Sequence, residues 1–330
     1  QDPKYQMPTP ESHLGMLSEE EVALMKKWIK QGAKYEKHWA FAPPKKAALP
    51  EVDHDEWPRS ELDRFVLAKM EQKGLTPNET ADKEYLLKRV SLDLTGLVPS
   101  LALQNKFLAD NSEQAYSKIV DEILKQPAYG EKMAIHWLDV ARYSDSYGYQ
   151  DDNIRTQWPW RDWLIHAFNK NLAYDKFVIW TLAGDMLPDT DKEKILATGF
   201  YRNHKYTEEG GVIPEEYRIE YILDKTKTYT KGILAMTVEC AQCHDHKYDP
   251  ISQKDYYSMF AFFNNTPEVG YEGDVSQSKP AKKPLISISD ADTKNLLRFI
   301  NRSDTAMLTV SVLEERDTLR PTYVLNRGVY

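Results

Sequence analysis

The feature that most constrains this chain is its cysteine usage. Only two of its 330 residues are cysteines, and both lie in one pentapeptide, Cys240-Ala-Gln-Cys-His244. Two thiols at this spacing can add to the vinyl groups of one haem, and the adjacent histidine is then held beneath the iron as an axial ligand. No further cysteine offers a rival disulfide or a four-cysteine zinc site. The pentapeptide therefore predicts covalent haem c on Cys240 and Cys243 with His244 as proximal ligand; a redox dithiol and a Cys/His metal site are the alternatives.

The compartment and the classes of partner follow from the same pentapeptide and from composition. Covalent haem attachment normally takes place outside the cytoplasm, so we expect a periplasmic, extracellular or cell-surface location in a bacterium. Lys and Arg total 43 against 51 Asp and Glu, a net charge of -8. No basic run alternates with aromatic residues, which argues against a nucleic-acid partner. Nowhere do about 18 consecutive apolar residues occur, so no membrane span is expected.

Helical patterns dominate the chain. Ser18 and Glu21 form a capping box at the start of a helix predicted over 19–31. Apolar spacing predicts further helices over these ranges: 62–70, 85–94, 103–108, 116–124, 130–143, 158–169, 215–238 and 256–263. Alternating residues over 284–289 and 307–313 predict strands. The expected fold is mainly α, an irregular helical, c-type cytochrome-like domain with long loops and a few short strands near the C-terminus.

Several stretches together resemble one family. They are His136-Trp-Leu-Asp-Val-Ala-Arg142, Trp158-Pro-Trp-Arg-Asp162, Leu182-Ala-Gly-Asp-Met186, Ala197-Thr-Gly-Phe200, Glu208-Glu-Gly-Gly211 and the run from Cys240 to Pro250. The chain resembles the planctomycete-type cytochrome family of large secreted multidomain proteins. The resemblance implies a remnant of a preceding cytochrome domain over 1–44, a linker over 45–59, a haem-binding helical domain over 60–265, and a connector with the start of a following domain over 266–330. We therefore expect a fragment.

The ligand on the opposite face of the haem decides which chemistry is open. His136 and His204 are the candidates for the distal iron ligand, and an open or water-bound iron is the alternative. Two protein ligands favour electron transfer, whereas an open face permits reaction with a substrate.

Acidic and aromatic residues form two further groups. Five carboxylates are candidates for an acidic cleft: Asp139, Glu208, Glu209, Glu216 and Glu220. Calcium is the expected cation there if these carboxylates neither pair with arginines nor are simply exposed to solvent. The aromatic residues crowded into 137–163 fit plain core packing, a haem crevice or a sugar platform.

Three functions are consistent with these features. The first is a monohaem cytochrome domain that transfers electrons to or from a redox partner protein or domain. The second is a haem-dependent oxidoreductase acting directly on a carbohydrate or related substrate, which the resemblance alone suggests. The third is a non-catalytic binding or scaffold component of a surface assembly.

Overall fold

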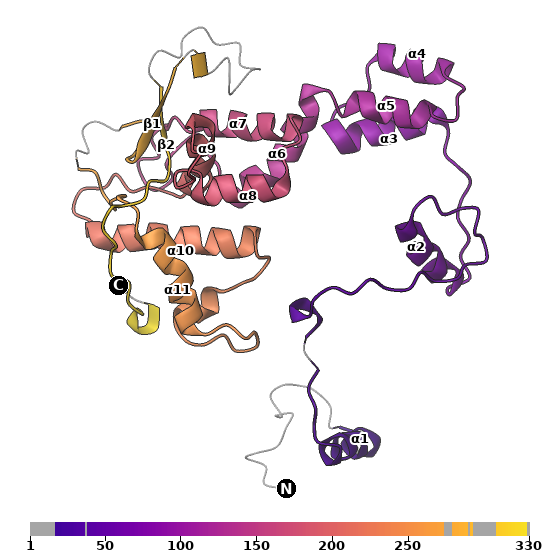
Figure 1. The fold of residues 1–330 in the computed structure, drawn as a ribbon, viewed down its shortest axis with the longest axis horizontal. Helices are drawn as coiled ribbons and strands as arrows, with labels where there is room; N and C mark the ends of the chain where they lie inside the picture. Colours follow the sequence, from indigo (N-terminus) through magenta and orange to yellow (C-terminus); the bar gives the residue numbers. More distant parts are fainter. Residues whose placement is uncertain (1–16, 37, 274–278, 290, 293–307, 329–330) are drawn as a thin grey trace. The chain divides into compact units, whose positions relative to one another are not determined.

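The computed structural model describes residues 17–36, 38–273, 279–289, 291–292 and 308–328. These residues divide into two compact units, one ending at Thr80 and the other beginning at Ala81. Figure 1 follows the elements along the chain. No helix in these ranges is long and apolar enough to cross a membrane.

The first unit contains α1 (Glu19–Lys30), the short 3-10 helix η3 (Trp39–Phe41) and α2 (Glu61–Glu71). The capping box predicted for α1 is confirmed, because Ser18 accepts from the Glu21 amide and Glu21 accepts from the Ser18 amide. Ser60 and Asp63 form the same box at α2. Helix α1 buries none of its residues. Its boundaries therefore come from its caps rather than from packing.

The second unit holds all the remaining elements. In order these are α3 (Lys83–Thr95), α4 (Leu101–Ala109), α5 (Ala115–Ile123), α6 (Pro127–Ala141), α7 (Trp158–Asn169), α8 (Tyr174–Ala183), α9 (Lys192–Ala197), η4 (Thr198–Arg202), α10 (Pro214–Gly232), η5 (Glu239–Gln242), α11 (Gln253–Asn264), β1 (Leu285–Ile288), β2 (Leu308–Ser311) and η6 (Asn326–Gly328). The strands pair antiparallel, with Leu285 opposite Ser311. The predicted fold class, mainly α with short strands near the C-terminus, is confirmed.

Helices α3, α4 and α5 form a small separate core. Leu87, Phe107, Ile119 and Ile123 are buried together there. Helix α3 also contacts α6, which joins this bundle to the rest of the unit (Figure 1).

The main core lies among α6 to α11. Most of the aromatic residues that crowd 137–163 pack here, with Trp160 and Trp163 fully buried, whereas Tyr147 belongs to a separate tyrosine cluster and Tyr149 is exposed. Gly130 lets α6 and α7 approach closely, since a Cβ on it would lie 2.4 Å from the Ile165 carbonyl oxygen. Ile288 and Val310 of the hairpin belong to the same core. The segment expected to be a connector thus contributes to the interior.

One predicted helix has a different end. Apolar spacing predicts a helix from 215 to 238, but α10 stops at Gly232. Gly232 faces Val140, whose Cγ1 atom would lie 2.4 Å from an added Cβ. Three residues later Ala235 takes a left-handed conformation with φ of 53°. Helix α10 thus ends at a glycine, a weak helix former, and the chain reaches Cys240 through a turn rather than from a helix end.

Candidate functional site

The pentapeptide forms a short turn at the surface. Glu239–Gln242 make up η5, and Cys243 caps it. A 3-10 helix has three residues per turn, so residues three apart eclipse one another. Cys240 and Cys243 therefore lie on one side of the turn, and both are free and exposed. Ala241 between them is fully buried and fixes the turn to the core.

Helix α11 and the chain near residue 328 hold this turn in place. The Gln242 carbonyl oxygen accepts hydrogen bonds from the Tyr257 hydroxyl at 3.0 Å and from Gln253 Nε2 at 3.1 Å. On the other side, the Gln242 side chain donates through Nε2 to the Gly328 carbonyl oxygen at 3.1 Å, and the Cys243 thiol lies 3.1 Å from the Arg327 carbonyl oxygen. The backbone between the two cysteines is therefore rigidly placed.

The histidine of the pentapeptide has one ring nitrogen engaged. His244 is exposed, and its Nδ1 lies 2.7 Å from the backbone carbonyl oxygen of Asp245. An N–H at Nδ1 donates to that oxygen, which leaves the Nε2 lone pair available. Within the described ranges, Nε2 has no hydrogen-bond partner. Asp245 is itself held, because its Oδ1 accepts from the Gln253 amide at 2.8 Å.

His246 shapes the loop that follows. Its Nδ1 accepts hydrogen bonds from the backbone amides of Tyr248 at 3.3 Å and Asp249 at 2.9 Å. Its own amide donates to the Ile251 carbonyl at 2.8 Å. The His246 side chain and backbone therefore stabilise the turn that follows the pentapeptide.

The two candidate distal ligands lie in different surroundings. His136 is exposed on α6. His204 is buried, with Nε2 2.7 Å from Glu268 Oε1 and Nδ1 2.7 Å from the Lys205 carbonyl oxygen. Tyr221 stacks on its ring, with centroids 4.5 Å apart. In this arrangement both ring nitrogens of His204 are occupied, so ligation of iron would require the side chain to leave its network.

That network centres on a carboxylate which the sequence did not single out. Glu268 is paired with Lys225, His204 and Arg202, the last at 3.4 Å, and all four side chains are nearly inaccessible. Burial, followed by the nearby Lys225 and Arg202 charges, lowers the pKa of His204 well below its usual value. A buried lysine gives no local sequence pattern, so only the three-dimensional structure could reveal this cluster.

The five acids expected to share a cleft are spread over several places. Asp139 is exposed on α6, and Glu216 is exposed on α10. Glu208 accepts from Asn153 at 2.7 Å and pairs with Lys282 at 2.6 Å. Glu209 accepts from Gln150. Only Glu220 lines the polar pocket described next.

This polar pocket has a volume of about 370 Å³ and lies beside α10. Arg142 and Asp224 form an ion pair of 2.6 Å in its wall. Burial, and then the charges of Glu216 and Asp224, raise the pKa of Glu220. Arg142 and Tyr149 both have positive φ, 58° and 53°, so this wall contains backbone strain.

Calcium has no evident site in the part of the chain that the structure covers. There, no three His, Cys, Asp or Glu side chains are grouped so that they could hold a metal ion. Of the five acids, Glu208 is paired with a lysine, Lys282, and Glu209 accepts from the neutral Gln150. The calcium site stays a prediction.

The fold and the site together define a helical domain that presents a C-x-x-C-H turn on its surface. The model of the PSCyt2 family, described as a protein of unknown function (DUF1549), matches residues 61–268. The chain belongs to this family, in keeping with the resemblance stated above. No curated protein and no solved structure matched the chain.

Proposed function

We propose that this chain is a monohaem c-type domain that transfers electrons to or from a redox partner protein or domain outside the bacterial cytoplasm. The observation that carries the proposal is the pentapeptide turn, in which Cys240 and Cys243 are exposed on one side and the following His244 has its Nε2 available. Both features are needed to hold haem c, which supplies a one-electron couple when it is bound.

The contact of His244 Nδ1 supports the role of proximal ligand. Metal-ligating histidines almost always donate their other ring N–H to a carboxylate, a backbone carbonyl or water, which fixes the tautomer and the ring orientation. The carbonyl oxygen of Asp245, 2.7 Å from Nδ1, is such an acceptor. Asp245 is anchored in turn to the first turn of α11 through the Gln253 amide. His244 is therefore preorganised with the nitrogen that would face iron already bearing the lone pair.

The surface position of the thiols supports electron transfer over a reaction in a closed cleft. A group bonded to two exposed cysteines has that edge at the protein surface, where a partner can approach within electron-transfer distance. His136, exposed on α6, is the better of the two candidates for the distal ligand, because His204 is already held by Glu268 and Lys205.

The first experiment asks whether haem is attached. The chain is expressed with a bacterial haem-attachment system in the periplasm, and its mass and pyridine haemochrome spectrum are measured. We expect one haem per chain, lost in Cys240→Ser/Cys243→Ser and retained in His246→Asn as a matched control. A chain that retains two free thiols, or that carries a Cys240–Cys243 disulfide, would overturn the proposal; the disulfide would indicate a redox dithiol instead.

A second measurement separates electron transfer from direct catalysis. Low-spin bands that do not change with cyanide or carbon monoxide are expected for an iron with two protein ligands. High-spin bands that shift with these ligands would contradict the electron-transfer proposal and favour an oxidoreductase. Substituting His136 and His204 by alanine, one at a time, and recording the spin state identifies the distal ligand.

A further inference from the structure

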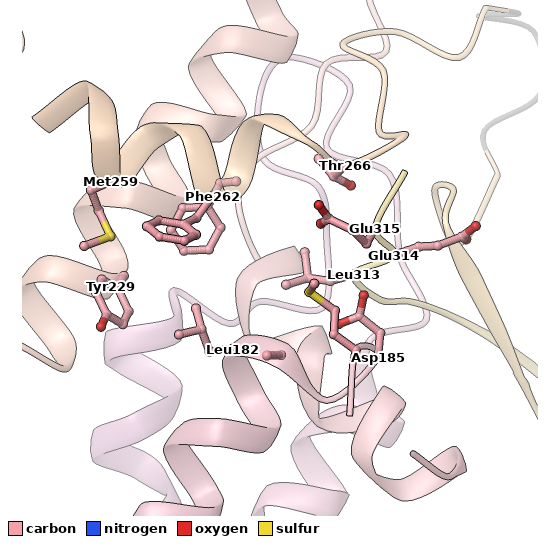
Figure 2. Close-up of a pocket in the computed structure, with 12 residues that line it drawn as sticks. Leu182, Asp185, Tyr229, Met259, Phe262, Thr266, Leu313, Glu314 and Glu315 are labelled. Atoms are coloured by element: carbon pink, nitrogen blue, oxygen red, sulfur yellow. The ribbon is translucent and has the colours of Figure 1, made fainter. Parts of the chain in front are cut away.

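An apolar pocket of about 360 Å³ shares no lining residue with the pentapeptide turn or the polar pocket (Figure 2). It is formed by the end of α8, by α10 and α11, and by the segment after β2. Its lining includes Leu182, Tyr229, Met259, Phe262 and Leu313. The volume is in the range of small-molecule sites, which are mostly apolar with a few polar groups.

The pocket has two chemically different ends. In Figure 2, Met259 and Tyr229 lie at one end, whereas Asp185, Glu314 and Glu315 lie at the other. Phe262 at the opening is 74% exposed. This ring is therefore accessible to a molecule that enters the pocket.

The acidic end has no counter-charge. No Lys, Arg or His lines the pocket, and Asp185, Glu314 and Glu315 form no ion pair within the described ranges. Glu315 accepts a hydrogen bond from Asn265, a neutral donor. Burial, and then the charges of Glu315 and Glu314, raise the pKa of Asp185. An added cation would therefore be attracted to three carboxylates that pair with no cationic side chain among the described residues.

We propose that this pocket binds a small organic cation, with its apolar body against Leu182, Met259 and Phe262 and its ammonium group at Asp185 and Glu315. The same carboxylates repel an anion with an apolar chain, such as a fatty acid. A neutral molecule of the same shape gains the apolar contacts without the charge-assisted hydrogen bonds. The proposal does not depend on haem attachment.

The test uses three probes that share one apolar body and differ in the head group: phenylpropylamine, phenylpropanol and phenylpropanoate. Binding to the full chain is measured by calorimetry and by NMR shifts at the pocket. We expect the amine to bind roughly tenfold or more tightly than the alcohol, and the acid to bind least. Equal binding of amine and alcohol, or no binding of the amine, would overturn the proposal.

Variants then locate the effect. Asp185→Asn and Glu315→Gln should each remove most of the preference for the amine, while Glu216→Gln, an exposed carboxylate on α10 outside the pocket, should keep it. Phe262→Ser should weaken the binding of the amine and of the alcohol to a similar extent. Because this ring is exposed, the variant should still fold. If both Asp185→Asn and Glu315→Gln still bind the amine more tightly than the alcohol, the ammonium group binds elsewhere and the proposal is contradicted. Circular dichroism of each variant checks the fold.

Discussion

His204 Nε2 lies 2.7 Å from Glu268 Oε1 in the interior of the second unit, where neither side chain is more than 3% exposed. Glu268 also forms ion pairs with Lys225 and Arg202, which reach it from α10 and η4. One carboxylate thus ties three segments together. Because ions are costly to bury, the network is stable only while its charges stay paired.

Replacing Glu268 should strongly destabilise this unit. Glu268→Gln leaves Lys225 and Arg202 without their shared counter-ion, and we expect a loss of about 3–5 kcal/mol in the free energy of unfolding. Urea denaturation followed by circular dichroism measures it. Glu122→Gln, which breaks the exposed pair with Lys106, is the control and should cost about 1 kcal/mol or less. Similar losses for the two variants would contradict this account.

The same network predicts a pH dependence of stability. Burial lowers the pKa of His204 in the folded chain to well below 6.5, whereas in the unfolded chain the imidazole takes up a proton near pH 6.5. The unfolded state then binds more protons, so stability is full above about pH 6.5 and falls as the pH is lowered. Unfolding free energies between about pH 7.5 and about pH 5 should have a smaller slope in His204→Gln than in the wild type.

The exposed His136 provides the comparison for this slope. In the chain expressed without haem, His136→Gln is the matched change at an exposed position of α6 and should leave this slope as it is in the wild type. A His204→Gln variant that retains the wild-type slope would show that other groups account for the pH dependence.

Local signals predicted much of the helical framework. The capping box of Ser18 and Glu21 marks the start of α1, and apolar spacing marks α3 to α7 and α11. Helices α8 and α9 were missed. The α8 sequence, Tyr174–Ala183, is apolar on most sides and so has little helical periodicity, and α9 is too short for a period to be recognised.

The candidate site also contains residues that the sequence predicts and residues that it does not. The pentapeptide is a contiguous motif, so its residues were found without the structure. Lys225 and Glu268 are 43 residues apart and meet only through the packing of α10 against the chain after α11. No local pattern connects them, just as none connects Asp185 with Glu315.

Gly184 is required by close packing. A Cβ at this position would lie 2.0 Å from the Lys194 carbonyl oxygen and 2.5 Å from that of Trp180. Gly184→Ala should therefore destabilise the unit by about 1–3 kcal/mol, because backbone atoms cannot give way as a flexible side chain can. Gly184→Ser should cost more. Thermal unfolding checks both, and a wild-type melting temperature in Gly184→Ala would show that the packing there is looser than described.

The loop after the pentapeptide should depend on the acceptor at residue 246. His246→Ala removes the nitrogen that accepts from the amides of Tyr248 and Asp249, and we expect a loss of about 0.5–1.5 kcal/mol. His246→Asn should retain most of that stability, since an asparagine side-chain oxygen accepts from backbone amides in the same kind of turn. Amide hydrogen exchange reads the effect at its origin: Tyr248 and Asp249 should exchange faster in the alanine variant and close to wild type in the asparagine variant. Equal exchange in the two variants would mean that the loop is held by the backbone hydrogen bond from the His246 N–H to the Ile251 carbonyl oxygen alone.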